Sequence, residues 1–199
     1  MKHSLEKYLL QESVKGVMPV LVEYGIVLKI KSPRITRHGD YRKLPNGTFQ
    51  ITINANLNRY AFLLTLIHEL AHHATYMRFG SKIKPHGIEW KQTFAQMIKP
   101  FLLPPHFDES LIPLLNRHFV NPKASSDTDS KLSLAMKSFN SPNDKSYIFE
   151  IPEGSRFALY NGRMFVKGKQ RTKRFECKET KSGRTYLFNP NAEVEIIDI

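Results

Sequence analysis

The sequence predicts an α+β fold, and three observations support this prediction. Residues 57–79 form a long, largely apolar stretch at helical spacing without glycine or proline. Two short segments before it, residues 26–30 and 48–53, have the composition of strands. Five further strand-like segments lie close together after residue 147. We therefore expect a first domain of helices with a small β-hairpin sheet, followed by a small C-terminal β-rich, barrel-like domain.

The N-terminal part of the chain predicts a helix and a hairpin. Apolar residues recur near helical spacing over residues 5–24, and Pro19 is expected to kink or split this helix. Residues 26–30 follow as a strand. Residues 32–43 are basic and extended, and the turn signal Pro-Asn-Gly precedes the alternating strand at residues 48–53.

The long apolar helix has signals at both of its ends. Asn56 or Asn58 could serve as its N-cap, and Gly80 is a natural stop. A helix this apolar is buried on most sides. Further on, residues 108–119 predict a short amphipathic helix that Pro113 interrupts or kinks.

Residues 121–146 differ from the rest in being polar and poor in apolar side chains. They predict a linker between a domain of residues 1–120 and a β-rich domain of residues 147–199. One short docking helix, with Leu132 and Phe139 among its apolar residues, is expected inside the linker. The strands expected in the β-rich domain are 156–160, 163–167, 171–179, 185–188 and 192–197.

The most informative motif is the pentad His68-Glu69-Leu70-Ala71-His72, which lies inside the long helix. Residues four apart share a helical face, so both histidines can direct a ring nitrogen at one point. Zn²⁺ accepts two such nitrogens and leaves room for a third ligand and a water. The carboxylate of Glu69 lies beside the pair and could take a proton from that water. The alternative is a hydrogen-bonded pair of core histidines, but a metal with its water would satisfy all three buried groups.

The third zinc ligand must come from outside the pentad. His86 lies fourteen residues after His72, just before a second predicted helix, and is the preferred candidate. Glu89 is the main rival, because some zinc enzymes use a carboxylate as third ligand. His73 points about 100° away from His72 on the helix, and His106 lies in a proline-rich turn. We expect His73 to lie behind the ligands or on the surface, and His106 to be structural.

The pentad followed by His-Gly-Ile-Glu-Trp at residues 86–90 resembles the SprT-like family, which includes bacterial SprT proteins and the Spartan-type proteases of eukaryotes. The resemblance covers residues 5–120. It implies a zincin-like zinc metallopeptidase domain. In the eukaryotic branch it implies proteolysis of proteins crosslinked to DNA, and in the bacterial branch a role linked to transcription. The resemblance assigns His68, His72 and His86 as metal ligands and Glu69 as general base.

The chain departs from this family at its C-terminal end. Many SprT-like proteins carry a zinc ribbon with two C-x-x-C pairs, whereas this chain has one cysteine, Cys177. One thiol cannot build a four-thiolate site. The resemblance therefore supports one zinc ion, with Cys177 as an ordinary buried side chain, and the β-rich domain is expected to be a small barrel or a metal-free relic of the ribbon.

Composition limits the compartment and the partners. The chain has no apolar run long enough to span a membrane and no secretory signal, and a lone cysteine fits a reducing compartment, so we expect a cytoplasmic protein. Its formal net charge of +12 favours polyanions such as DNA or RNA. The residues expected to touch nucleic acid lie in two basic stretches: Arg34, Arg37, Arg42 and Lys43, and Lys169, Arg171, Lys173 and Arg174.

These observations predict a zinc-dependent metalloendopeptidase acting on proteins associated with nucleic acid. One alternative is a non-catalytic nucleic-acid-binding adaptor with a structural zinc. A second is zinc-dependent hydrolysis of a non-protein amide, which the pentad does not exclude.

Overall fold

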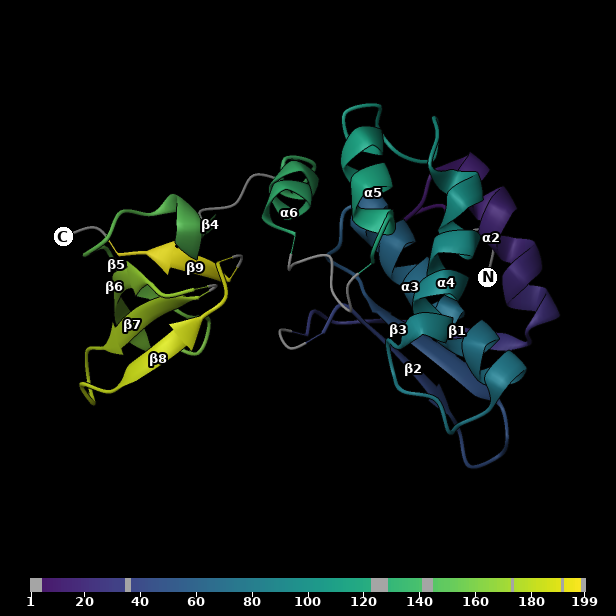
Figure 1. The fold of residues 1–199 in the computed structure, drawn as a ribbon, viewed down its shortest axis with the longest axis horizontal. Coiled ribbons are helices and arrows are strands. Elements are labelled where there is room, and N and C mark those ends of the chain that lie inside the picture. The colour runs from purple at the N-terminus through teal and green to yellow at the C-terminus, as the bar shows by residue number, and fades with distance from the viewer. Residues whose placement is uncertain are drawn as a thin grey trace. The chain divides into compact units, whose positions relative to one another are not determined.

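The fold is mixed α+β, as predicted (Figure 1). The computed structural model describes residues 5–34, 37–122, 129–140, 145–172, 174–190 and 192–197, and within them it holds five α-helices and two β-sheets. The chain divides into two compact units. Unit 1 comprises residues 1–126 and 134–140, and unit 2 comprises residues 127–133 and 141–199.

The first long helix of unit 1 is α2 (Gln11–Glu23), which is shorter than the helix predicted over residues 5–24. Pro19 lies inside α2 and does not split it. Residues 5–9 form a separate turn, in which the backbone N–H of Leu9 donates to the carbonyl of Leu5. Gly25 follows α2 with φ of 59°, a left-handed conformation that glycine adopts without a steric penalty.

The sheet of unit 1 has three strands, β1 (Ile26–Lys31), β2 (Gly39–Lys43) and β3 (Phe49–Asn54). Their order is β1-β3-β2, so β3 is central. β3 pairs antiparallel with β2, which lies at the end of the extended segment expected there, and parallel with β1, so the two predicted strands do not form a hairpin with each other. A parallel partner requires a crossover, and the basic segment between β1 and β2 supplies it.

The central strand β3 is buried on both of its faces. Successive side chains of a strand point to opposite faces. Ile51 and Ile53 are fully buried on one face, and α3 packs against β3 and β2. Gln50, Thr52 and Asn54 occupy the other face and are buried as well. Buried polar side chains need hydrogen-bond partners, which Arg34 supplies to Thr52 and Asn54, and Arg42 of β2 supplies to Gln50.

The long predicted helix is α3 (Arg59–Phe79). Asn58, not Asn56, is its N-cap, because its side-chain oxygen accepts hydrogen bonds from the backbone N–H groups of Tyr60 and Ala61. The helix ends at Gly80, whose φ is 76°.

Two further helices complete the part of unit 1 that matters for the site. α4 (Ile88–Ile98) packs against α3 and buries Trp90 and Phe94, and η1 (Lys99–Phe101) continues it. α5 (Ile112–Phe119) contains Pro113 in its first turn. The helix predicted over residues 108–119 is therefore shorter than expected, and Pro113 lies near its start instead of kinking its interior. A missing N–H costs nothing in the first turn of a helix, where that group has no partner inside the helix.

One more helix lies within the predicted linker, and the sheet of unit 2 follows it. The helix is α6 (Ser130–Lys137). The sheet begins after it, with a short η3 (Ile148–Glu150) next to its first strand. Its strands are β4 (Lys145–Tyr147), β5 (Arg156–Ala158), β6 (Met164–Gln170), β7 (Phe175–Glu179), β8 (Thr185–Phe188) and β9 (Glu193–Ile196).

The sheet of unit 2 is open, so the predicted barrel is wrong. Its order is β4-β9-β5-β6-β7-β8, and all paired strands are antiparallel. Closure would require β4 to pair with β8, and within the described residues each of them has a single partner. The prediction missed β4, the three-residue strand that occupies the free side of β9.

The core of unit 2 is small and apolar. Phe157, Phe165, Val194 and Cys177 are fully buried in it. Burial raises the pKa of the Cys177 thiol to about 11, as expected for an unreactive structural cysteine.

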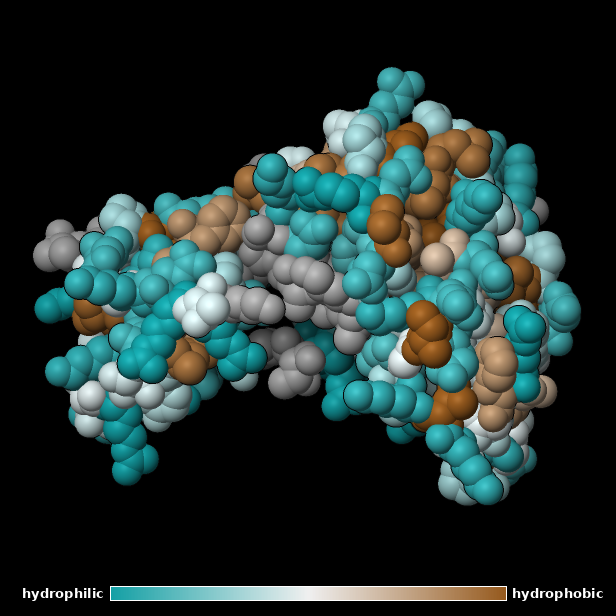
Figure 2. Space-filling model, in the orientation of Figure 1, coloured by the Kyte–Doolittle hydropathy of each residue, from teal (hydrophilic) through white to brown (hydrophobic). Residues whose placement is uncertain are grey.

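On the face drawn in Figure 2, hydrophilic side chains predominate and hydrophobic ones form small separate spots. None of the described helices is both long and apolar enough to cross a membrane.

Candidate metal centre

Helix α3 presents two neighbouring rows of side chains to two different elements. His68 and His72 form one row, and both rings contact Trp90 of α4. Glu69 and His73 form the adjacent row, which is turned by about 100° and faces β2. The two rows therefore face different neighbours: α4 on the side of the histidines, and β2 on the side of Glu69 and His73.

Three histidine rings converge on one point. The Nε2 atoms of His68 and His72 are 3.2 Å apart, those of His72 and His86 are 3.0 Å apart, and those of His68 and His86 are 3.3 Å apart. A tetrahedral zinc ion with Zn–N bonds of about 2.0–2.1 Å separates its nitrogen ligands by roughly 3.3 Å. The spacing of the three nitrogens therefore fits a divalent ion bound between them.

The protonation state of these rings suits a metal. Burial, together with a smaller effect of the neighbouring histidines, lowers the pKa of His68 to about 3 and that of His72 to about 4. Burial also lowers the pKa of His86. Neutral imidazole is the form that binds metal. Three ring nitrogens facing one another cannot all be satisfied by mutual hydrogen bonds, because each ring nitrogen can either donate or accept and cannot do both.

The backbone at His86 is in an uncommon conformation. Its φ is 57°, in the left-handed region that non-glycine residues seldom occupy. The next residue, Gly87, donates its N–H to the carbonyl of Lys84 at 2.9 Å, and a Cβ at position 87 would stand 2.9 Å from that same oxygen. This tight turn directs His86 toward the row of α3 ligands. Such strain is found mostly where function requires a fixed geometry.

The rival third ligands lie elsewhere. The Nδ1 atom of His73 lies 3.2 Å from the Tyr41 hydroxyl, and the Nδ1 atom of His106 lies 3.0 Å from the Ser13 hydroxyl. Among the described residues, the His, Cys, Asp and Glu side chains that could share one metal ion are His68, His72 and His86, without Glu89.

Glu69 is held in a confined space beside β2. Its side chain is only 7% exposed. Gly39 of β2 lies so close that an added Cβ would stand 2.6 Å from its Oε1 atom. The pKa of Glu69 is raised to about 8, mainly by burial and also by Asp40, while Arg34 and Arg37 oppose the shift. A divalent ion bound nearby would favour the charged carboxylate and bring this pKa down.

Tyr41 is the second β2 residue that faces α3. Its ring lies 6.5 Å from that of His72, centroid to centroid, and its hydroxyl reaches His73. Burial raises the pKa of Tyr41 to about 12, so the hydroxyl is protonated at neutral pH. The position of Tyr41 beside the ligand row could not be read from the sequence, because it depends on the pairing of β2 with β3.

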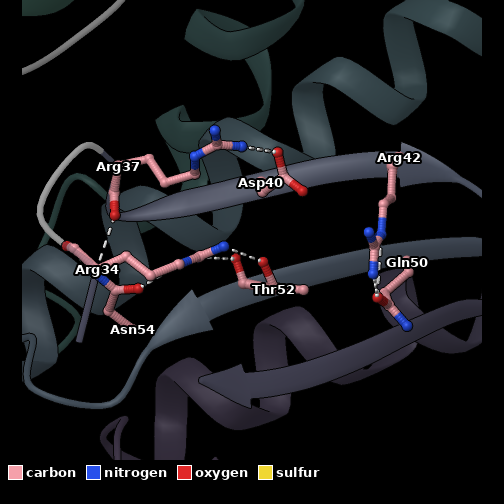
Figure 3. A network of polar contacts seen from close by, with 7 residues as sticks. All are labelled: Arg34, Arg37, Asp40, Arg42, Gln50, Thr52 and Asn54. Atoms are coloured by element: carbon pink, nitrogen blue, oxygen red, sulfur yellow. Dashed lines mark hydrogen bonds and ion pairs between the residues drawn. The ribbon is translucent and has the colours of Figure 1, made fainter. Parts of the chain in front are cut away.

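The basic segment before β2 covers the polar face of β3, as Figure 3 shows. Arg34 donates from Nε to the side-chain oxygen of Asn54 at 2.8 Å and from Nη1 to the hydroxyl of Thr52 at 2.9 Å. Asn54 returns two hydrogen bonds, to the carbonyls of Arg34 and Arg37. These contacts fix the crossover that leads into β2, and thereby the strand that confines Glu69.

The residues predicted to contact nucleic acid fall into two groups. Several already have partners inside the protein: Arg34 binds β3, Arg37 pairs with Asp40 at 2.8 Å, Arg42 donates to Gln50, and Arg171 pairs with Glu176 at 2.5 Å. Lys43, Lys169 and Arg174 are exposed, and the ammonium of Lys43 lies over the ring of Phe49. Lys173 lies outside the described residues. Nucleic-acid binding by these residues stays a prediction.

Residues 27–108, which contain β1 to β3, α3, α4 and all three histidines, match the model of the SprT-like family. No curated protein matches the chain, and no solved structure matches it.

Proposed function

Because the chain belongs to the SprT-like family through residues 27–108, we propose that it is a zinc-dependent metalloendopeptidase. The observation that carries the proposal is the convergence of His68, His72 and His86 on one point, with the buried carboxyl group of Glu69 on the next row of the same helix. Three histidines around a zinc ion are typical of catalytic sites, in which the fourth position stays open.

Each residue has a distinct role in the proposed reaction. His68, His72 and His86 would hold the ion, which supplies Lewis acidity: it lowers the pKa of water toward neutrality and polarises the scissile carbonyl. Glu69 would accept the proton of the attacking water and return it to the leaving nitrogen. Gly39 leaves the space in which the carboxylate stands, so the base is confined on the side of β2.

The substitution Glu69→Gln tests the assigned base. We expect the variant to bind one zinc ion per chain, because no ligand changes, and to lose at least about a hundredfold in kcat, as removal of a general base does. Zinc content by atomic emission and cleavage of an unfolded protein substrate measure the two effects.

The matched control is Glu89→Gln, the same chemical change at a glutamate outside the histidine cluster. It should retain both zinc and cleavage. Full peptidase activity of Glu69→Gln would reject Glu69 as the base, and a wild-type protein that binds no zinc would reject the metal site.

We further propose that the substrates are proteins bound to nucleic acid. The net charge of +12 and the exposed Lys43, Lys169 and Arg174 support this proposal. Cleavage of a DNA-crosslinked protein should exceed cleavage of the same protein without DNA, and the difference should shrink as salt rises. Salt-sensitive DNA binding that survives zinc removal, with no cleavage of either substrate, would favour the adaptor alternative.

A further inference from the structure

We propose that Trp90 is a positioning residue for the metal centre, whose indole ring packs against all three imidazole rings and holds them at the spacing that a divalent ion requires. The centroid of its ring lies 4.7 Å from that of His68, 5.3 Å from that of His72 and 4.6 Å from that of His86. These distances lie within the range of packed aromatic pairs. This inference rests on the metal site of the proposed function and is independent of peptidase activity.

The three contacts differ in orientation, and together they restrict different motions. The indole plane is nearly parallel to His72, at 28°, and nearly perpendicular to His86, at 89°. It meets His68 at 61°. A stacked ring opposes tilting of His72, whereas an edge contact opposes rotation of His86 about its side-chain bonds. One rigid side chain therefore constrains ligands that come from two separate segments of the chain.

A hydrogen bond does not explain why a tryptophan occupies position 90. Trp90 is 1% exposed, and its Nε1 is the one buried side-chain nitrogen or oxygen without a hydrogen-bond partner among the described residues. Leaving a buried donor without a partner is unfavourable. A leucine would avoid this penalty but would lack a flat surface for three rings. What the indole contributes here is its contact with the ligands.

Metal affinity and ligand geometry, rather than activity, test the proposal. Trp90→Leu should bind Co²⁺ and Zn²⁺ about ten- to a hundredfold more weakly than the wild type, the usual range when a group that orients the ligands is lost. The visible absorption of the Co²⁺-loaded variant at saturation should also change, because that spectrum depends on the coordination geometry. Trp90→Phe keeps an aromatic ring and should recover most of the affinity.

Phe107→Leu is the matched control for a loss of stability. Phe107 is also 1% exposed and lies in the same unit, but its ring partner is Tyr60. This control should unfold at a lower temperature than the wild type and keep the metal affinity and the Co²⁺ spectrum. If Trp90→Leu binds metal with the wild-type affinity and spectrum, the proposal is overturned while the proposed function stands.

A measurement on the unchanged protein covers the case in which Trp90→Leu fails to fold. Trp90 is the only tryptophan of the chain, so its emission reports on this site alone. One equivalent of Co²⁺ should quench most of that emission, and a chelator should restore it. Emission that stays unchanged while one equivalent of Co²⁺ is bound would place the ion away from Trp90 and overturn the inference. A wild-type protein that binds no divalent metal would instead overturn the proposed function as well.

Discussion

Gly39 stands directly beside the carboxyl group of Glu69, on the side of β2 that faces α3. Its conformation is not the reason for a glycine, because its φ is not positive. Space is the reason: a Cβ at this position would lie 2.6 Å from Oε1 of Glu69 and 2.7 Å from the methyl group of Thr65. A side chain here must therefore displace the proposed base or move β2.

We predict that Gly39→Ala lowers kcat by about ten- to a hundredfold, because displacements near 1 Å have effects of this size on catalysis. The zinc content should stay at one per chain, since none of the three ligands touches the added methyl group. Steady-state cleavage rates and metal analysis of the purified variant give the two values.

Gly16→Ala is the appropriate comparison for Gly39→Ala. A Cβ at Gly16 would also be crowded, 2.7 Å from the ring of Phe101, but this contact is remote from Glu69. The added Thr65→Ser change should restore part of the lost rate of Gly39→Ala, because it removes one of the crowding atoms. Wild-type cleavage by Gly39→Ala would mean that β2 does not set the position of the base.

At the residue scale, the sequence could predict only the local part of the candidate site. His68, Glu69 and His72 lie on one helix, so their spacing alone places them on adjacent rows. The contacts of Gly39, Tyr41 and Trp90 depend on strand pairing and on the packing of α3 against α4. Such contacts join residues far apart in the chain, so the periodicity of the sequence cannot predict them.

At the scale of single elements, α3 depends on its cap. Asn58 uses its oxygen to cap the first turn, and its side-chain nitrogen donates to the carbonyl of Met136 at 2.9 Å and to Asn140 at 2.6 Å. Asn58 thus joins the start of the ligand-bearing helix to a segment nearly eighty residues away in the sequence.

We predict that Asn58→Ala lowers the free energy of unfolding by about 1–2 kcal/mol, the usual effect of losing an asparagine cap. Asn56→Ala should change it by less than about 0.5 kcal/mol, as surface substitutions do, because Asn56 is exposed and does not cap α3. Urea unfolding followed by circular dichroism measures both. Equal losses in the two variants would contradict the assignment of the cap.

The basic stretch of residues 32–43 shows why composition alone cannot identify nucleic-acid contacts. In the sequence, Arg34 and Arg42 look like phosphate contacts. In the structure they donate to Thr52, Asn54 and Gln50, side chains eight to twenty residues further along. A guanidinium group bonds a buried polar strand face as readily as it bonds a phosphate. Only the alternation of β3, with its three polar side chains, hinted that this face needed donors.

The sheet of unit 2 shows a limit of the same kind. Five strands were predicted close to their observed places, but β4 was missed. β4 has only three residues and overlaps the end of the segment predicted as a linker, residues 121–146. Without β4, a closed barrel was a reasonable way to avoid free edges. The order β4-β9-β5 is set by a partner that lies about fifty residues away in the chain. Short strands with distant partners leave little local signal.

At the scale of the whole molecule, the metal centre gives the metal-free protein opposing responses to pH. Burial lowers the pKa of His68 and His72 to about 3 and about 4, from 6.5 in the unfolded chain. Below pH 6.5 the unfolded chain therefore binds more protons at these histidines, and stability falls with falling pH. The pKa of Glu69 is raised to about 8, from 4.5. Between these values the folded protein binds the extra proton, so stability falls with rising pH.

We predict that the chelator-treated protein is most stable at about pH 6.5–7.5, where the two responses meet, because the lowered pKa of His86 adds to the acid response. Toward pH 8 the histidines are neutral in both the folded and the unfolded protein, so only Glu69 still differs and gives a decline of up to about 1.4 kcal/mol per pH unit. Glu69→Gln should remove the loss of stability above the optimum. It should also steepen the loss below the optimum, because glutamine cannot bind the proton that opposes the effect of the histidines. Urea unfolding at pH 5 to 8, followed by Trp90 emission, measures both limbs. An alkaline decline of the same size in Glu69→Gln would show that another group causes it, and that Glu69 is already ionised in the folded, metal-free protein.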